Sequence, residues 1–85
     1  MIRHAFKIII DFLNGEYDAL DFSYDFPAFL IEEYETMEKE NKEVNDILND
    51  NIPEICAEYE VGEPPDKFKK SIKKEYDCAL EKWSK

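Results

Sequence analysis

Apolar side chains recur every three or four residues along most of the chain, which is the spacing of one face of an α-helix. This pattern predicts four helical segments, at about residues 2–13, 17–40, 43–59 and 66–83. No stretch shows the period-two alternation of a half-buried strand. Because the connections are short, we expect an all-α fold, an antiparallel four-helix bundle that forms a single domain over residues 1–85.

Glycine and proline mark where these helices should end or bend. Asn14-Gly15 is a stop signal after the first segment, and Gly-Glu-Pro-Pro at 62–65 predicts a rigid turn before the last one. Pro27 and Pro53 fall inside the second and third segments, where proline removes a backbone hydrogen bond. We therefore expect the second and third helices to be kinked or split at Pro27 and Pro53.

The apolar positions also predict the core. In the first segment one helical face carries Ile2, Phe6, Ile9, Ile10 and Leu13, while Ile8 and Phe12 lie on the opposite side. A helix that is apolar on two sides is expected to have neighbours on both. In the last segment an i, i+4 row ends at Trp83, which we also expect to be in the core.

Charge is unevenly distributed along the chain. There are 21 acidic and 11 basic residues, for a net charge of −10. The stretch 16–63 carries a net charge of −14, whereas residues 1–15 and 64–85 are slightly basic. Such a field repels nucleic acid and anionic membranes and attracts a cationic protein, so we expect no direct nucleic-acid or membrane partner. The alternative interpretation is that acidity only keeps the protein soluble.

The residue types needed for catalysis or metal binding are sparse. His4 is the only histidine and lies on the polar side of its helix, without a neighbouring nucleophile. Glu32, Glu35 and Glu38 lack the histidine partners of a di-iron site. The segment 46–51 lacks the central glycine of a calcium-binding loop, and no glycine-rich loop could hold a phosphate. We therefore expect a binding protein, not an enzyme, with no cofactor and no metal.

The two cysteines, Cys56 and Cys78, could form at most one disulfide. Nothing in the sequence indicates an oxidising compartment, since no signal peptide or membrane-spanning segment is apparent. We expect two reduced, mostly buried thiols.

An acidic stripe follows the third segment. Its residues are spaced by three or four positions and so share one helical face, opposite the apolar one; they are Glu43, Asp46, Asp50, Glu54 and Glu58. Like charges at i, i+4 destabilise a helix, here by roughly 1 kcal/mol for three pairs. We interpret this acidic stripe as a docking face for a basic partner, extended by Glu32, Glu35, Glu60 and Glu63. A solvated face without a partner is the alternative.

One short motif resembles a known family. The junction Phe12-Leu13-Asn14-Gly15-Glu16, followed by Ala19, Phe22-Ser23 and Phe26, is similar to that of colicin-D-type immunity proteins and of immunity proteins from contact-dependent growth inhibition systems. The similarity covers about residues 6–40. It implies a cytoplasmic four-helix protein that binds a co-encoded nuclease toxin, often a tRNase, and blocks its active site. We also expect the protein to be a monomer. Acidic side chains of such a protein occupy the place of substrate phosphates.

Two functions remain open at this point. One is an immunity protein that binds and inhibits a cationic nuclease toxin through the acidic stripe. The other is an acidic helical adaptor or regulatory subunit with no nuclease partner. The neighbouring gene distinguishes the immunity protein from the adaptor. An immunity gene should directly follow a gene that encodes a toxin with a basic C-terminal domain.

Overall fold

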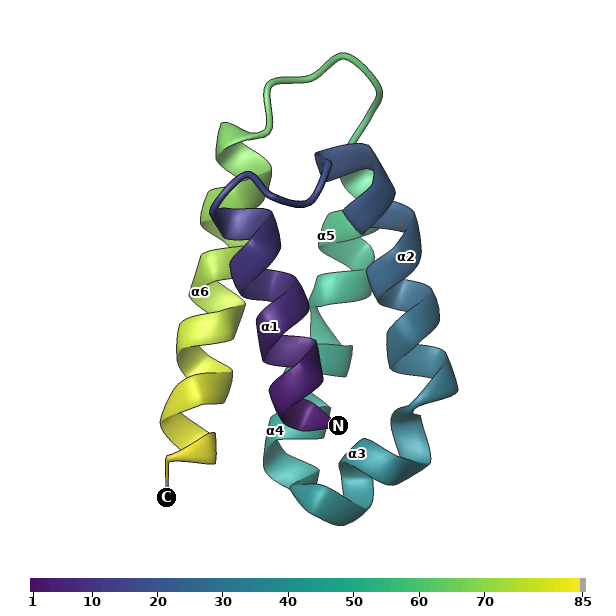
Figure 1. The fold of residues 1–85 in the computed structure, drawn as a ribbon, viewed down its shortest axis with the longest axis vertical. Coiled ribbons are helices and arrows are strands. Elements are labelled where there is room, and N and C mark those ends of the chain that lie inside the picture. The colour runs from purple at the N-terminus through teal and green to yellow at the C-terminus, as the bar shows by residue number, and fades with distance from the viewer. Residues whose placement is uncertain (85) are drawn as a thin grey trace.

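The computed structural model describes residues 1–84, and these form an all-α protein (Figure 1). The helices are α1 (Ile2–Leu13), α2 (Ala19–Glu32), α3 (Tyr34–Glu40), α4 (Lys42–Asp50), α5 (Ile52–Glu58) and α6 (Asp66–Trp83). The expected helical class is therefore confirmed. The simple four-helix bundle is not, because each of the two middle segments is divided into two helices.

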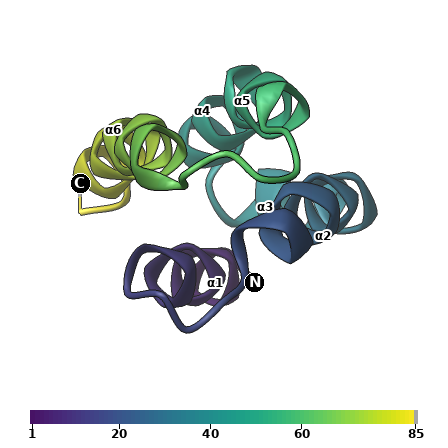
Figure 2. The same ribbon diagram turned by 90° about the horizontal axis from the view of Figure 1, so that it is seen from above.

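The helical segments alternate in direction around a shared core. In Figure 1, α1 rises from the N-terminus, α2 descends beside it, α4 and α5 rise behind, and α6 descends to the C-terminus. Helix α1 contacts α2 and α6, while α5 contacts α2 and α6, so the four long segments form a closed ring (Figure 2). Helix α3 lies against α4 at the lower end.

The expected break at Pro27 is wrong in position. Helix α2 runs through Pro27 and ends at Glu32, and the chain bends at Glu33 instead. A proline inside a helix costs about 3 kcal/mol. Here the turns on both sides are held by Phe22, Phe26 and Leu30, which are fully buried. The bend at Glu33 lets α3 turn across the end of the molecule.

The third segment divides next to Pro53, as the sequence predicted. Helix α4 ends at Asp50, and α5 begins at Ile52 with Pro53 in its first turn. A proline in that position loses nothing, because the first N–H groups of a helix have no partner within it. At the start of α4, the side chain of Asn41 accepts a hydrogen bond from the Val44 N–H at 3.1 Å and caps the helix.

A stack of aromatic rings joins α1, α2 and α6. The rings of Phe12 and Phe22 are parallel, with centroids 4.1 Å apart, and Phe26 continues the stack at 5.0 Å from Phe22. Phe68 of α6 packs against Phe12 at 4.8 Å. Phe12, Phe22 and Phe26 are fully buried, and Phe68 is 6% exposed. Trp83, in contrast, is only partly buried against this core.

The junction between α1 and α2 is built from the motif that begins at Phe12. Gly15 has a φ of +81°, which side-chain-bearing residues rarely adopt, so glycine suits this turn. Asp18 then caps α2 by accepting hydrogen bonds from the N–H groups of Leu20 and Asp21. The conformation of this motif is therefore explained by the folding of the α1–α2 turn.

One polar side chain is enclosed by the core. Asn45 of α4 is fully buried, and its Oδ1 accepts a hydrogen bond from the Asn49 amide at 2.9 Å. Its own Nδ2 has no hydrogen-bond partner among the described residues. A buried donor left unpaired typically costs about 1–3 kcal/mol, so Asn45 is a local weakness of this core.

Within residues 1–84, none of the helices combines the length and the apolar character needed to cross a membrane.

Candidate partner-binding surface

All nine acidic residues proposed from the sequence have exposed side chains. They are Glu43, Asp46, Asp50, Glu54 and Glu58 of the acidic stripe, together with Glu32, Glu35, Glu60 and Glu63. The stripe spans two helices, with Glu43, Asp46 and Asp50 on α4 and Glu54 and Glu58 on α5. The structure thus makes every predicted residue accessible to a partner.

The α4 part of the stripe is partly neutralised by lysines. The Lys42 ammonium lies 2.9 Å from an Asp46 carboxylate oxygen, and its pKa is raised by this hydrogen bond. Lys82 of α6 lies 3.9 Å from Glu43. Within residues 1–84, Asp50 makes no ion pair. The negative charge of α4 is therefore least compensated at its C-terminal end, next to the break.

The α5 part of the stripe borders a groove toward α6. Glu54 and Glu58 line it from one side, and Ser71, Lys74 and Glu75 line it from the other. A second groove contains Glu58 and Glu63 together with Lys67. The structure thus brings Glu54, Glu58 and Glu63 together beside α6, where lysines reduce the negative potential on one side.

The loop after α5 is held in place by local hydrogen bonds. The Tyr59 hydroxyl donates to the Glu63 backbone oxygen at 2.8 Å, and the Glu60 N–H donates to a Glu63 carboxylate oxygen at 3.3 Å. Tyr59 itself stacks on Phe68 at 4.7 Å. Glu60 and Glu63 are therefore presented by an ordered turn at the end of α5.

Glu32 and Glu35 lie on either side of the bend at Glu33. This bend is at the end of the molecule opposite the loop between α5 and α6 (Figure 1). The two grooves beside α5 are lined by residues of α5, α6 and the loop between them, so Glu32 and Glu35 are not part of them. Glu33, at the bend itself, is half-buried.

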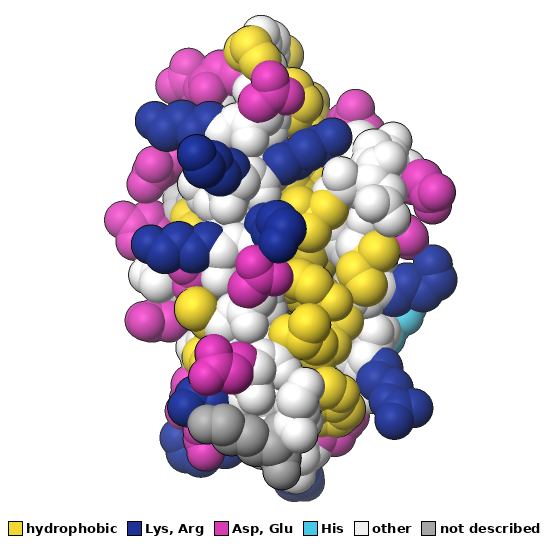
Figure 3. Space-filling view, turned by 90° about the vertical axis from the view of Figure 1, so that its left-hand side faces the viewer, with side chains coloured by type: hydrophobic (Ala, Val, Ile, Leu, Met, Phe, Trp, Pro, Cys, Tyr) yellow, Lys and Arg dark blue, Asp and Glu magenta, His cyan; other side chains and the backbone are white. Residues whose placement is uncertain are grey.

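Several lysines gather on the face formed by α1 and α6. Figure 3 shows dark-blue lysines around an apolar band between α6 and α1. A groove in this region is lined by Ile10, Leu13, Asn14, Lys69, Lys70 and Lys73. Ile10, which the periodicity placed in the core, is 39% exposed here. Lysines of α6 thus line this groove as well as the grooves beside the acidic stripe, so the acidic and basic surfaces meet along α6.

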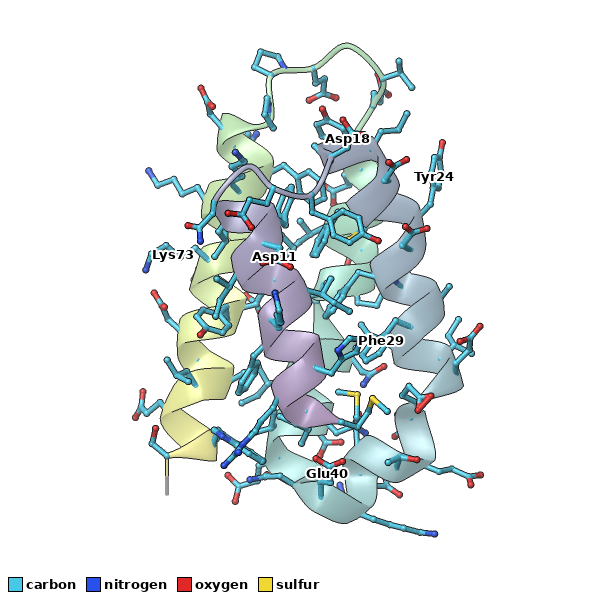
Figure 4. The ribbon with its side chains drawn as sticks, viewed as in Figure 1. Asp11, Asp18, Tyr24, Phe29, Glu40 and Lys73 are labelled. Carbon is cyan, nitrogen blue, oxygen red and sulfur yellow. The ribbon has the colours of Figure 1, made fainter. Side chains whose placement is uncertain are left out.

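Two exposed apolar residues of α2 were missed by the sequence analysis. Tyr24 is 67% exposed and Ile31 is 78% exposed. Figure 4 shows Tyr24 directed away from the other helices, whereas Phe29 of the same helix is directed toward α1. The signal was available in the sequence, because Tyr24 and Ile31 are seven residues apart and lie opposite the buried row of Phe22 and Phe26.

The thiols and the acidic groups do not form a chemical centre. Cys56 and Cys78 are both unpaired. Burial raises the pKa of the Cys56 thiol to about 12, which keeps it protonated and unreactive at neutral pH. Cys78 is exposed, which contradicts the expectation that both thiols are buried. Among the described residues, no cluster of three or more His, Cys, Asp or Glu side chains could hold a metal ion.

Comparison of the chain with models of protein families, with curated proteins and with solved structures finds no match.

Proposed function

We propose that this chain is an immunity protein, which binds and inhibits a co-encoded cationic nuclease toxin. The observation that carries the proposal is an exposed, under-compensated acidic stripe, Glu43–Glu58, on a folded helical scaffold. A cationic nuclease must attract phosphates, so a surface of fixed carboxylates can compete with its substrate. The resemblance of residues 6–40 to immunity proteins supports the same function.

The break between α4 and α5 concentrates the charge. Asp50 closes α4, and Glu54 lies in the first turn of α5, so the two carboxylates flank the bend at Asn51. Neither makes an ion pair within residues 1–84. Asp50 is also at a helix C-terminus, where a negative charge is unfavourable. We propose that Asp50, whose position costs stability, and Glu54 beside it meet lysines or arginines of the toxin.

The test is a double charge reversal, Asp50→Lys with Glu54→Lys. It should weaken toxin binding by several kcal/mol and abolish protection, because two attractive pairs become repulsive at the interface. Circular dichroism should stay helical. The melting temperature should hardly change, because Asp50→Lys improves the C-terminal end of α4 while Glu54→Lys worsens the start of α5.

The matched control is Glu16→Lys with Glu81→Lys, at two exposed positions that do not belong to the stripe. Both double variants change the net charge from −10 to −6, since each reversal adds two units. If the control loses as much affinity as the stripe variant, binding depends on net charge alone. If the stripe variant still protects cells fully, the acidic stripe is not the docking face.

A further inference from the structure

The acidic stripe supplies charge, but it has no apolar centre. Large hydrophobic side chains that are exposed within residues 1–84 are Met1, Ile10, Tyr24, Ile31, Tyr34, Val61 and Leu80. None of these is on α4 or α5. Tight protein interfaces generally depend on a few buried aromatic or apolar anchors, with charged groups around them. Val61, between Glu60 and Glu63, is a single exposed apolar residue, so a row of anchors must come from another element.

Helix α2 has the required arrangement. Tyr24, Ala28 and Ile31 are all exposed and are spaced as i, i+4 and i+7, so they form one row on the outer face. This row lies opposite the fully buried Phe22 and Phe26, and Tyr24 and Ile31 are 67% and 78% exposed. Neither tyrosine nor isoleucine is favoured over alanine in a solvated helix, so folding does not explain these residue types.

A row of carboxylates runs beside the apolar row. Asp21, Asp25 and Glu32 follow it at helical spacing and are exposed, and α2 contains no lysine or arginine. The only hydrogen bond that a side chain of residues 1–84 donates to this carboxylate row is from the Tyr17 hydroxyl to Asp25, at 2.5 Å. A neutral or acidic partner would remove these groups from water without replacing their hydrogen bonds, which is costly.

We infer that the outer face of α2 is a second part of the partner interface. Tyr24 and Ile31 enter an apolar depression of a cationic protein, while Asp21, Asp25 and Glu32 pair with its basic side chains. A second copy of this chain does not fit the same face, since two such rows would bring like charges together. Helix α2 packs against α5, which carries Glu54 and Glu58 of the acidic stripe. The identity of that partner as a nuclease toxin rests on the proposed function.

The experiment compares Tyr24→Ala and Ile31→Ala with Ile10→Ala, which removes an exposed apolar side chain on the opposite side of the molecule. With the purified cationic nuclease domain, the α2 variants should each bind about 30-fold more weakly or worse, and the control should stay within about threefold. Melting temperatures of the free α2 variants should match the wild type, because their side chains have no core contact. If both α2 variants bind within about threefold of the wild type, the inference is wrong even though the proposed function stands.

A photo-crosslinking amino acid at position 31 gives an independent answer if no nuclease binds. Capture of a different basic protein, whose purified form binds more weakly to Ile31→Ala, would support the α2 face and reject the nuclease. Absence of any cross-link in the producing cells, cross-linking to a second copy of this chain, or capture of an acidic protein would overturn the inference. The same label at position 10 shows whether capture is specific to α2.

Discussion

At the scale of single residues, Phe12 and Trp83 were both expected in the core, but the structure buries them to different extents. Phe12 is fully buried and in contact with Phe22 and Phe68, whereas Trp83 is partly exposed near the end of α6. Phe12→Ala should lower the free energy of unfolding by about 3–5 kcal/mol. Trp83→Ala should lower it by about 2 kcal/mol or less, since less apolar area is lost. Denaturant melts check both values, and equal losses would contradict the assignment of Phe12 to the centre of the core.

A second residue-scale prediction concerns acid. Glu40 accepts hydrogen bonds from the Met1 amino group at 2.7 Å and from the Ile2 N–H at 3.0 Å, beneath the start of α1 (Figure 4). These bonds lower the pKa of Glu40 from its usual 4.5. A carboxyl whose pKa falls on folding stabilises the protein above its unfolded pKa, and this stabilisation is lost as pH falls through the folded pKa.

Glu40→Gln should therefore melt at a lower temperature than the wild type near pH 7, and this gap should close as the pH falls below about 4. Glu35→Gln, on an exposed part of α3, removes the same charge without these bonds and is the control. Thermal melts between pH 7 and pH 3 measure the gap. A gap for Glu40→Gln that is the same at every pH would show that the carboxylate charge does not matter there.

At the scale of elements, the sequence predicts what the local pattern specifies. The bounds of α1 and α6 agree with the expected segments, and the division at Pro53 follows from the geometry of proline. The bend at Glu33 has no such local signal, since no glycine or proline lies there. It depends on what α3 packs against, which is α4, the next helix along the chain, and the distant start of α1, where Met1 and Ile2 donate hydrogen bonds to Glu40.

In the candidate site, too, the local pattern predicts some features, while others depend on how the helices pack. Spacing was sufficient to predict that Asp46, Asp50 and Glu54 are exposed, because the core face of that segment is clear. It could not show that Lys82 lies near Glu43 or that Glu58 and Glu63 share a groove, since both depend on the position of α6. Tyr24 and Ile31 were missed because apolar residues on two sides of a helix look like two core faces until the neighbours are known.

At the scale of the whole molecule, the net negative charge predicts that salt affects the stability of the free protein and its association with a cationic partner in opposite directions. The free protein carries a net charge of −10, and few ion pairs offset the repulsion on its acidic side, so screening should raise its melting temperature. In an encounter with a cationic partner, the same charges attract, so screening should slow association. The Debye length falls from about 30 Å at 0.01 M salt to about 8 Å at 0.15 M, which is short compared with the size of the acidic face.

The measurement pairs thermal melts of the free protein with stopped-flow association with the toxin domain, each at 10 and 150 mM salt. The melting temperature should rise with salt while the association rate constant falls, by about tenfold or more for a strongly steered encounter. Asp50→Lys with Glu54→Lys should reduce both salt responses, because it removes charge from the surface that causes them. A rate constant that does not change with salt would mean that the acidic surface does not steer the encounter. Acidity would then serve solubility, and a helical adaptor would be the better interpretation of this chain.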